Sequence, residues 1–181
     1  MASRVLDAKR VLDIGWWKVE VYSGTNFDIK LGTLYVQCEE AFFIGAWAPP
    51  GDYDIINLFC TALPDKAPPW AYKVNCPDIH YSLRYHAKVY LPLEGTYSFE
   101  SWNDDGLRLY VDGQKLIDDW NFHGPTRNVV NVALAKGWHD IIVEYMEGGG
   151  NWVCLVGVTL PDGTKVKPLV PKAGIKFMVV P

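Results

Sequence analysis

Short runs of alternating apolar and polar residues, separated by turn formers, recur along most of this chain. The alternation is clear in WKVEVYS (residues 17–23), LRYHAKVYL (83–91) and TYSFESW (96–102), and it returns in the more apolar HDIIVEYM (139–146) and WVCLVGVTL (152–160). A period of two places successive side chains on opposite faces of a strand. The pattern therefore predicts β-strands, and no segment shows the sustained stripe of an amphipathic helix.

Turn formers stand between these runs at intervals of roughly 8–12 residues. They include Glu94-Gly95, Asp105-Gly106, Asp112-Gly113 and the triple glycine at 148–150. Such spacing is typical of an antiparallel sandwich or barrel. Between two strand-like runs, Asp112-Gly113 predicts a type I′ hairpin turn.

The chain has 181 residues, which fits one domain, and no change of composition marks a boundary. We expect residues 1–181 to form a single all-β antiparallel sandwich or barrel. The proline-rich segment at about 61–79 is interpreted as one long surface loop inserted into it. The motif RVLD occurs twice within residues 3–13, and its even offset favours a strand there.

Charge and hydropathy limit the partners. The net charge of −4 argues against general nucleic-acid binding, because phosphate contacts need a basic face. The longest apolar run, at 153–160, falls well short of the roughly 20 residues of a membrane helix, so we expect no membrane insertion. The charged start, MASRVLDAKRVLD, lacks the apolar core of a secretory signal.

Four cysteines occur, and none has the C-x-x-C spacing of a zinc or redox site. Cys154 lies in an apolar strand pattern and is expected to be a buried thiol. Cys60 and Cys76 flank the proline-rich segment, where a disulfide would close a long loop. Two alternatives stay open: a disulfide between Cys60 and Cys76, or two free thiols.

Two adjacent acids, Asp104 and Asp105, interrupt the strand pattern in the acidic loop at 103–106. Neighbouring carboxylates on an extended strand point to opposite faces. They can converge on one ion only where the backbone bends sharply, which Gly106 permits. Because Ca²⁺ prefers about six to eight oxygen ligands, the pair is a candidate calcium site. Asp-Asp-Gly is equally good turn chemistry, and this alternative stays open.

Catalytic signatures are missing from the sequence. It contains no G-x-S-x-G, H-E-x-x-H, P-loop or Cys–His nucleophile pattern. A glycosidase needs two carboxylates held roughly 5–9.5 Å apart across a cleft. If Asp104 and Asp105 hold an ion, they cannot also transfer protons. We therefore expect no enzymatic activity.

Two long segments carry a family resemblance. GTYSFESWNDDGLRLYVDGQKLIDDW (95–120) and GWHDIIVEYMEGGGNW (137–152) resemble the PA14 domain family, a β-sandwich shared by glycosidases and yeast flocculin-type adhesins. Weaker similarity extends over residues 15–27, 80–99 and 158–166. Residues 28–79 match poorly, so the resemblance covers most of the chain but not all of it.

The resemblance implies a specific site. In the lectin-type members the matching Asp-Asp pair is joined by a cis peptide, and both side chains hold a calcium ion that a sugar's vicinal hydroxyls complete. A second loop supplies an amide side chain and backbone carbonyls. That loop matches residues 147–152, which makes Glu147, Asn151 and the carbonyls around Gly149 candidate ligands. Because this loop is rich in glycine, which of its side chains binds the ion stays open.

Further side chains near these loops are weaker candidates. Trp152 is the candidate ring for stacking against a sugar, although most tryptophans are expected in the core. His123, in the loop NFHGP, could line the site or make a structural hydrogen bond. Asp118 and Asp119 are expected to be solvated at a strand end rather than to bind metal.

The resemblance implies a calcium-assisted, lectin-like module that binds glycans in surface adhesion or glycan targeting, outside the cell or on its surface. The first alternative is a non-catalytic assembly subunit of a surface layer, appendage or capsid. The apolar ending GIKFMVVP (174–181) favours it, because a terminal strand can pair with a neighbouring subunit's sheet edge and so support self-association. A passive spacer is the second alternative.

Overall fold

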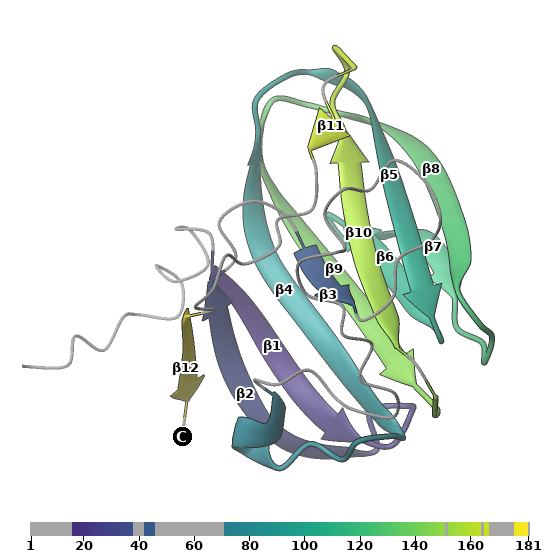
Figure 1. The fold of residues 1–181 in the computed structure, drawn as a ribbon. Coiled ribbons are helices and arrows are strands. Elements are labelled where there is room, and N and C mark those ends of the chain that lie inside the picture. Colours follow the sequence, from purple (N-terminus) through teal and green to yellow (C-terminus); the bar gives the residue numbers. More distant parts are fainter. Residues whose placement is uncertain are drawn as a thin grey trace, which may run out of the picture.

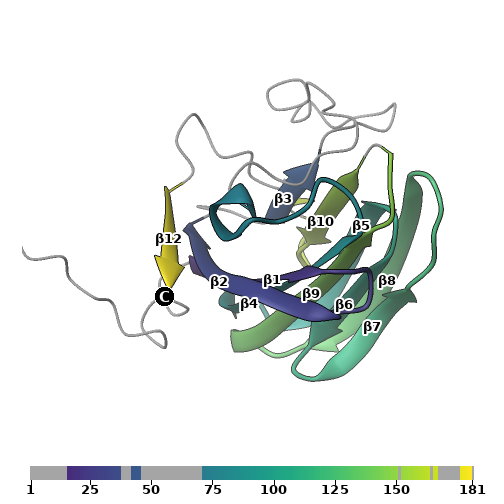
Figure 2. The same cartoon turned by 90° about the horizontal axis from the view of Figure 1, so that it is seen from below.

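The computed structural model describes residues 16–37, 42–45, 71–150, 152–163, 165–166 and 176–180. These residues form two antiparallel sheets that pack face to face (Figures 1 and 2). The predicted antiparallel sandwich is confirmed. The sheets do not close into a barrel, because each keeps two outer strands. The expected strand at 3–13 lies outside the described residues.

The larger sheet has seven strands in the order β12-β2-β1-β4-β9-β6-β7. In chain order these are β1 (Trp16–Ser23), β2 (Ile29–Gln37), β4 (Tyr81–Leu91), β6 (Leu107–Val111), β7 (Gln114–Asp119), β9 (Gly137–Glu147) and β12 (Lys176–Val180). Its centre is the long β4–β9 pair, whose register runs from Tyr81↔Glu147 to Leu91↔Gly137.

The smaller sheet follows the order β11-β10-β5-β8, and a short β3 also pairs with β10. Its strands are β3 (Phe42–Gly45), β5 (Gly95–Asp104), β8 (Thr126–Leu134), β10 (Val153–Thr159) and β11 (Lys165–Val166). A 3-10 turn, η2 (Ala71–Val74), lies in the described part of the proline-rich segment, and residues 61–70 of that segment lie outside it.

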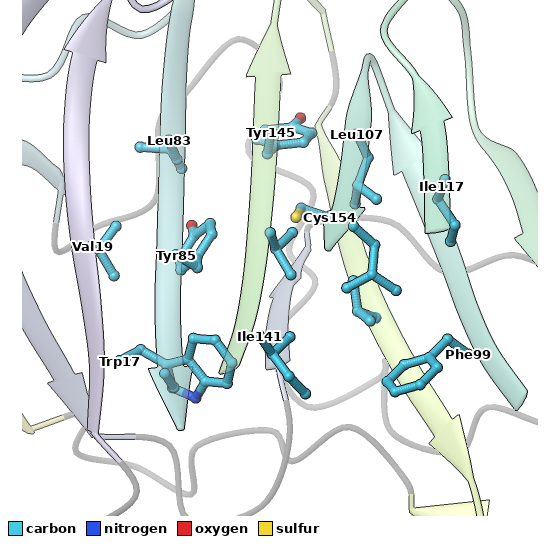
Figure 3. Packing of buried hydrophobic residues seen from close by; sticks show 14 of the residues in the cluster. Trp17, Val19, Leu83, Tyr85, Phe99, Leu107, Ile117, Ile141, Tyr145 and Cys154 are labelled. Atoms are coloured by element: carbon cyan, nitrogen blue, oxygen red, sulfur yellow. The ribbon is translucent and has the colours of Figure 1, made fainter. Parts of the chain in front are cut away.

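The core fills the space between the sheets, and the alternation in the sequence decides which side chains enter it. In β9, for example, His139, Ile141, Val143 and Tyr145 are all buried. Figure 3 shows side chains from both sheets meeting in this layer. Each fully buried Leu, Ile, Val or Phe side chain contributes roughly 1.5–3 kcal/mol. The hydrophobic effect therefore holds the two sheets together.

Two local predictions can be compared with the structure. Asp112 and Gly113 have φ angles of 49° and 80°, and Val111 pairs with Gln114, so the predicted β6–β7 hairpin turn is confirmed. Cys154 is a buried free thiol, as predicted. Cys76 is also a buried free thiol. Cys60 lies outside the described residues, and the alternative of a bridge to Cys76 is not realised in the structure.

The C-terminal strand β12 lies at the outer edge of the larger sheet (Figure 1). It pairs antiparallel with β2 of the same chain, with Met178 opposite Tyr35. Self-association through this strand stays a prediction. Within the described ranges, no helix is both long and apolar enough to cross a bilayer.

Strand register brings four connections to one end of the sandwich. At this end Tyr81 pairs with both Ser23 and Glu147, which places the β1–β2 turn beside the end of β9. Leu107, at the start of β6, pairs with Tyr145, so the acidic loop joins the same end. The β7–β8 connection (120–125) and the glycine-rich β9–β10 connection (148–152) complete it.

Candidate functional site

The acidic loop is the point where the chain crosses from one sheet to the other. Asp104 ends β5 and pairs with Val153 in the smaller sheet, whereas Leu107 begins β6 in the larger sheet. A Cβ atom on Gly106 would lie 2.7 Å from Cε of Met146, so the crossing is too tight for any larger residue without displacement. The expected bend is present, at Asp105 directly before Gly106.

The acidic loop brings three carboxyl groups together. The peptide between Asp104 and Asp105 is cis, in agreement with the resemblance. One oxygen each from Asp104, Asp105 and Glu147 lies within 4.8 Å of the other two, and all three residues are buried. Calcium–oxygen distances are about 2.3–2.6 Å, so a single ion placed between the three oxygens could reach all of them.

Asp105 is held in place by two neighbouring connections. Its Oδ1 accepts a hydrogen bond of 2.7 Å from the backbone N–H of His123. Its Oδ2 accepts one of 2.8 Å from the backbone N–H of Gly148. Asp105 thereby ties the β7–β8 and β9–β10 connections to the acidic loop.

Asp104 differs from Asp105 in its surroundings. Among the described residues, no donor hydrogen-bonds to its carboxylate, and the residue is 9% exposed. Burial, reinforced by the neighbouring charge of Asp105, raises the pKa of Asp104 to about 6, although His123 acts in the opposite direction. An ion can therefore bind the Asp104 carboxylate without displacing a hydrogen-bond donor from any described residue.

Glu147 is the most deeply buried of the three acids, at 1% exposure. Its Oε2 lies 2.9 Å from the hydroxyl of Tyr145, and its Oε1 accepts a hydrogen bond of 2.7 Å from the backbone N–H of Gly149. The pKa of Glu147 is raised to about 8, mainly by burial and in addition by the charges of Asp105 and Asp104. The two hydrogen bonds, with Tyr145 and Gly149, lower the pKa but do not offset these effects. Without a cation, burial therefore favours the protonated form of Glu147.

A buried polar network supports the loop from below. The side-chain amide of Asn103, which is fully buried, donates to the backbone oxygen of Asp105 (2.8 Å) and to Oδ2 of Asp119 (3.1 Å). Its oxygen accepts hydrogen bonds from Ser101 (3.0 Å) and Asn128 (3.3 Å). Sequence reasoning missed Asn103. The available signal was its place on the inward-facing side of β5, where a polar residue is unusual.

The two strand-end acids have different surroundings. Asp118 is half exposed and pairs with Arg108 and Lys115, which agrees with its expected solvated role. Asp119 is less exposed and belongs to the Asn103 network. Burial alone would raise the pKa of Asp119, but hydrogen bonds from Asn128 and Asn103 bring it below its ordinary value.

The expected role of Trp152 as a stacking ring is contradicted by its burial. Trp152 is 6% exposed and packs in the hydrophobic core, so neither face of its ring is open to a ligand. The position directly before β10 directs this large apolar side chain between the sheets. Asn151 lies outside the described residues, and its role as a ligand stays a prediction.

His123 has the structural hydrogen bond that was expected as one alternative. Its Nδ1 lies 2.7 Å from the carbonyl oxygen of Gly124. Its Nε2 lies 3.2 Å from Oδ1 of Asp119, which is an ion-pair distance for a protonated ring but lacks the direction of a hydrogen bond. The contact of His123 with the site is made by its backbone N–H and not by its ring.

A second residue that sequence reasoning missed is Phe122. Its side chain is 66% exposed, and its ring lies against Gly148 in the neighbouring connection. Its place in the loop NFHGP, beside His123, was the only signal in the sequence. Phe122 is thus the aromatic side chain that borders the acidic cluster from outside the core.

Comparison with known protein families gives a match over the part of the chain that contains the acidic cluster. A family model of the PA14 domain matches residues 75–170, which is more than half of the chain. The match spans the strands from β4 to β11 and contains all three acids of the cluster.

The similar proteins include anti-sigma factors and an adhesin domain. The anti-sigma-I factor RsgI3 of Acetivibrio thermocellus is 40% identical over 68 residues, which is 37% of this chain and 11% of that protein. A solved anti-sigma factor domain-containing protein has a TM-score of 0.65 at 22% identity, over 89% of this chain and 49% of that one. The Epithelial Adhesin 9 A domain of Candida glabrata, in complex with Galβ1-4GlcNAc, has a TM-score of 0.54 at 12% identity, over 91% and 89%. At these identities the two solved structures establish the fold alone.

Proposed function

The chain belongs to the PA14 domain family, and from this premise we propose that its acidic loop binds calcium and that the ion and the surrounding loops bind a carbohydrate. The observation that carries the proposal is the convergence of oxygens from Asp104, Asp105 and Glu147 within 4.8 Å of one another. When all three carboxyl groups are ionised they repel each other strongly at this spacing, and a divalent cation is the simplest group that would make the ionised arrangement favourable.

The donor set suits calcium in chemistry as well as in spacing. All three side chains offer oxygen, the ligand that calcium prefers, and no thiol or imidazole of a described residue joins the cluster. Ca²⁺ takes about six to eight oxygens, so three carboxylates leave positions for backbone carbonyls, for Asn151 and for a ligand's hydroxyl groups. Two adjacent hydroxyls of a sugar would complete the shell.

The proposed role is binding without catalysis. Carboxylates that hold one ion are not free to act as the acid and base of a glycosidase. The solved adhesin domain with bound Galβ1-4GlcNAc supports the proposal because its fold also places a sugar-binding site on a sandwich of this type. We place the protein outside the cell or on its surface, in adhesion or glycan targeting.

A second setting is favoured by the anti-sigma factor relatives. They are longer than this chain, and they indicate that a PA14 domain of this kind can be one part of a regulator. In that setting the same site would sense a glycan, and its occupancy would be the signal. The assembly alternative predicted from the sequence has no such relative among these comparisons.

The test combines calcium titration with a glycan microarray that carries Galβ1-4GlcNAc, β-lactose and plant and microbial polysaccharides. We expect calcium to raise the melting temperature and to be required for the array signal. Replacing Asp104 and Asp105 together with Asn should abolish both effects, because neutral amides bind a hard dication weakly. A chelator that changes neither the melting temperature nor the array signal would contradict the proposal.

A further inference from the structure

One aromatic side chain stands open to solvent beside the acidic cluster. Phe122 is 66% exposed, the highest value among the large apolar side chains in the described ranges. Single exposed apolar residues are common on protein surfaces, so exposure alone says little. Its position relative to the three acids is more informative.

The ring of Phe122 and the carboxylate of Asp105 both lie close to the position that a Cβ atom of Gly148 would occupy. A Cβ atom on Gly148 would lie 2.5 Å from Cε1 of Phe122 and 3.2 Å from Oδ2 of Asp105. With the ring in this position, a side chain at residue 148 would overlap it. The glycine therefore leaves room for the ring beside the cluster.

The backbone beside Phe122 is tied to the same carboxylate. The N–H of His123, the next residue, donates to Oδ1 of Asp105, while the N–H of Gly148 donates to Oδ2. These two hydrogen bonds hold the connection that carries the ring in a defined place relative to Asp105. The backbone that carries the ring is thus positioned before any ligand arrives, which lowers the entropic cost of binding.

We propose that Phe122 is the stacking platform of the carbohydrate site, on which the C–H face of a pyranose ring lies while two neighbouring hydroxyls of that sugar reach the ion. This inference rests on the proposed function and adds the class of ligand to it. A pyranose has polar hydroxyls around its rim and apolar C–H groups on its faces, so it can use both contacts at once. A ligand that offers only oxygens, such as a carboxylate or a short acyclic diol, would use the ion alone.

Phe122 takes the role that the sequence suggested for Trp152, which is buried. The chain also provides a matched control. Trp138 is 56% exposed and pairs edge-on with Tyr90 at a centroid distance of 5.4 Å. It precedes Glu147 along β9 by nine residues, which corresponds to about 30 Å in an extended strand. It is therefore an exposed aromatic residue at the opposite end of the sandwich.

The experiment compares Phe122→Ala, Phe122→Tyr and Trp138→Ala with the wild type. Calcium binding is measured as the rise in melting temperature, and glycan binding on the microarray described above, followed by calorimetry with the glycan that the wild type binds most tightly. We expect Phe122→Ala to weaken glycan binding about tenfold, the loss that corresponds to one stacked ring, with an unchanged calcium shift. Phe122→Tyr and Trp138→Ala should both bind glycan like the wild type.

The outcomes separate this inference from the proposed function. If Phe122→Ala binds glycan as tightly as the wild type, the platform is overturned while calcium-assisted binding stands. If the wild type shows neither a calcium shift nor glycan binding, both are overturned. If glycan binding is independent of calcium but lost in Phe122→Ala, the platform stands and the role of the ion does not. An equal loss in Trp138→Ala would overturn the platform, because the effect would then be a general one.

Discussion

The hydroxyl of Tyr145 lies 2.9 Å from Oε2 of Glu147, inside the core and directly beneath the acidic loop. The same hydroxyl also hydrogen-bonds to the backbone oxygen of Asp104. A phenol has one proton to donate, so both contacts are satisfied when Tyr145 donates to the Asp104 carbonyl and a protonated Glu147 donates to Tyr145. Burial favours the protonated form of Glu147 because it raises the pKa of this carboxyl group. In the metal-free protein, a proton on Glu147 would reduce the repulsion among the three acids, as a cation would.

The first prediction is that calcium stabilises the fold. An ion that binds only the folded state adds ~2.7 kcal/mol at a hundredfold excess over Kd, and at ~2–4 °C per kcal/mol this means a melting shift of very roughly 5–10 °C. Differential scanning calorimetry over a calcium series measures it. Magnesium is the control, because its smaller shell and reluctance to lose water should make its shift much smaller. Equal shifts with both ions would indicate a general charge effect.

The second prediction concerns pH in the metal-free protein. The pKa of Glu147 is about 8 in the folded state against an ordinary value of 4.5, so the folded protein binds a proton that the unfolded chain has released. Its contribution to stability is complete below 4.5 and is lost as the pH rises through about 8. The pKa of Asp104 is raised to about 6, so this residue also destabilises the fold as the pH rises, over a lower range of pH.

The measurement is the melting temperature in chelator over a series of pH values. We expect it to fall as the pH rises from about 5 to 9, and we expect Glu147→Gln to flatten much of that slope because the amide cannot ionise. Calcium should also flatten it, since the ion favours the charged carboxylate. A Glu147→Gln protein with the full wild-type slope would show that Glu147 is not the titrating group.

The third prediction separates the two adjacent acids. Both Asp104→Asn and Asp105→Asn should weaken calcium binding, but their effects on the metal-free protein should differ in sign. Asp105 accepts two backbone hydrogen bonds, from His123 and Gly148, and an amide can accept only one of them. Asp105→Asn should therefore destabilise by about 1–3 kcal/mol.

Asp104, by contrast, is a partly desolvated carboxylate beside another acid. Asp104→Asn removes that unfavourable charge, so at pH 8 it should stabilise the metal-free protein by about 1–2 kcal/mol. Urea unfolding of both variants in chelator checks the pair. The prediction fails if the two substitutions change the free energy of unfolding in the same direction by similar amounts.

The fourth prediction concerns Asn103. Replacing it with Leu would leave the backbone oxygen of Asp105 and the hydroxyl of Ser101 without their partners in a buried site. Each buried polar group without a partner costs about 1–3 kcal/mol, so we expect a loss of roughly 2–4 kcal/mol by urea unfolding and a weaker calcium shift. Asn131→Leu, at an exposed position of β8, is the matched control and should change little.

The fifth prediction concerns an acid–histidine pair at the hairpin turn. Nδ1 of His139 lies 2.6 Å from Oδ2 of Asp112, and its Nε2 lies 2.8 Å from the carbonyl oxygen of Ala135. Burial alone would lower the pKa of His139, but these hydrogen bonds raise it above 6.5. Burial alone would raise the pKa of Asp112, but the hydrogen bonds to His139 and to the backbone of Asp140 lower it below its ordinary value.

The histidine's contribution to stability is therefore complete below pH 6.5 and is lost as the pH rises through the raised pKa. The contribution of Asp112 to stability is present above pH 3.8 and is lost as the pH falls through its lowered pKa. Stability from the pair should be greatest between these limits, and His139→Gln should remove the part lost above pH 6.5. The comparison is best made in an Asp104→Asn, Glu147→Gln background, because those two acids titrate in the same direction. An unchanged slope in His139→Gln would refute the prediction.

Local patterns in the sequence determined the strands, the hairpin turn and the acidic pair. The alternation of apolar and polar residues acts over a few neighbouring positions, and the turn at Asp112-Gly113 depends only on its own backbone angles. The two adjacent acids and the glycine that follows them can also be recognised from neighbouring positions alone. These features can be predicted without knowing what lies across the sandwich.

Tertiary structure alone decided which side chains surround the acidic loop. Trp152 and Phe122 are both aromatic residues in loops at the same end, yet one is buried and the other is exposed. Their difference depends on whether the opposite sheet covers them, and no local period encodes that. The hydrogen bonds of Asp105 likewise come from Gly148 and His123, which are distant in sequence and meet it only because β5, β7 and β9 end together. Residue type and spacing determined that acids would be present, whereas strand register and sheet packing decided what holds them.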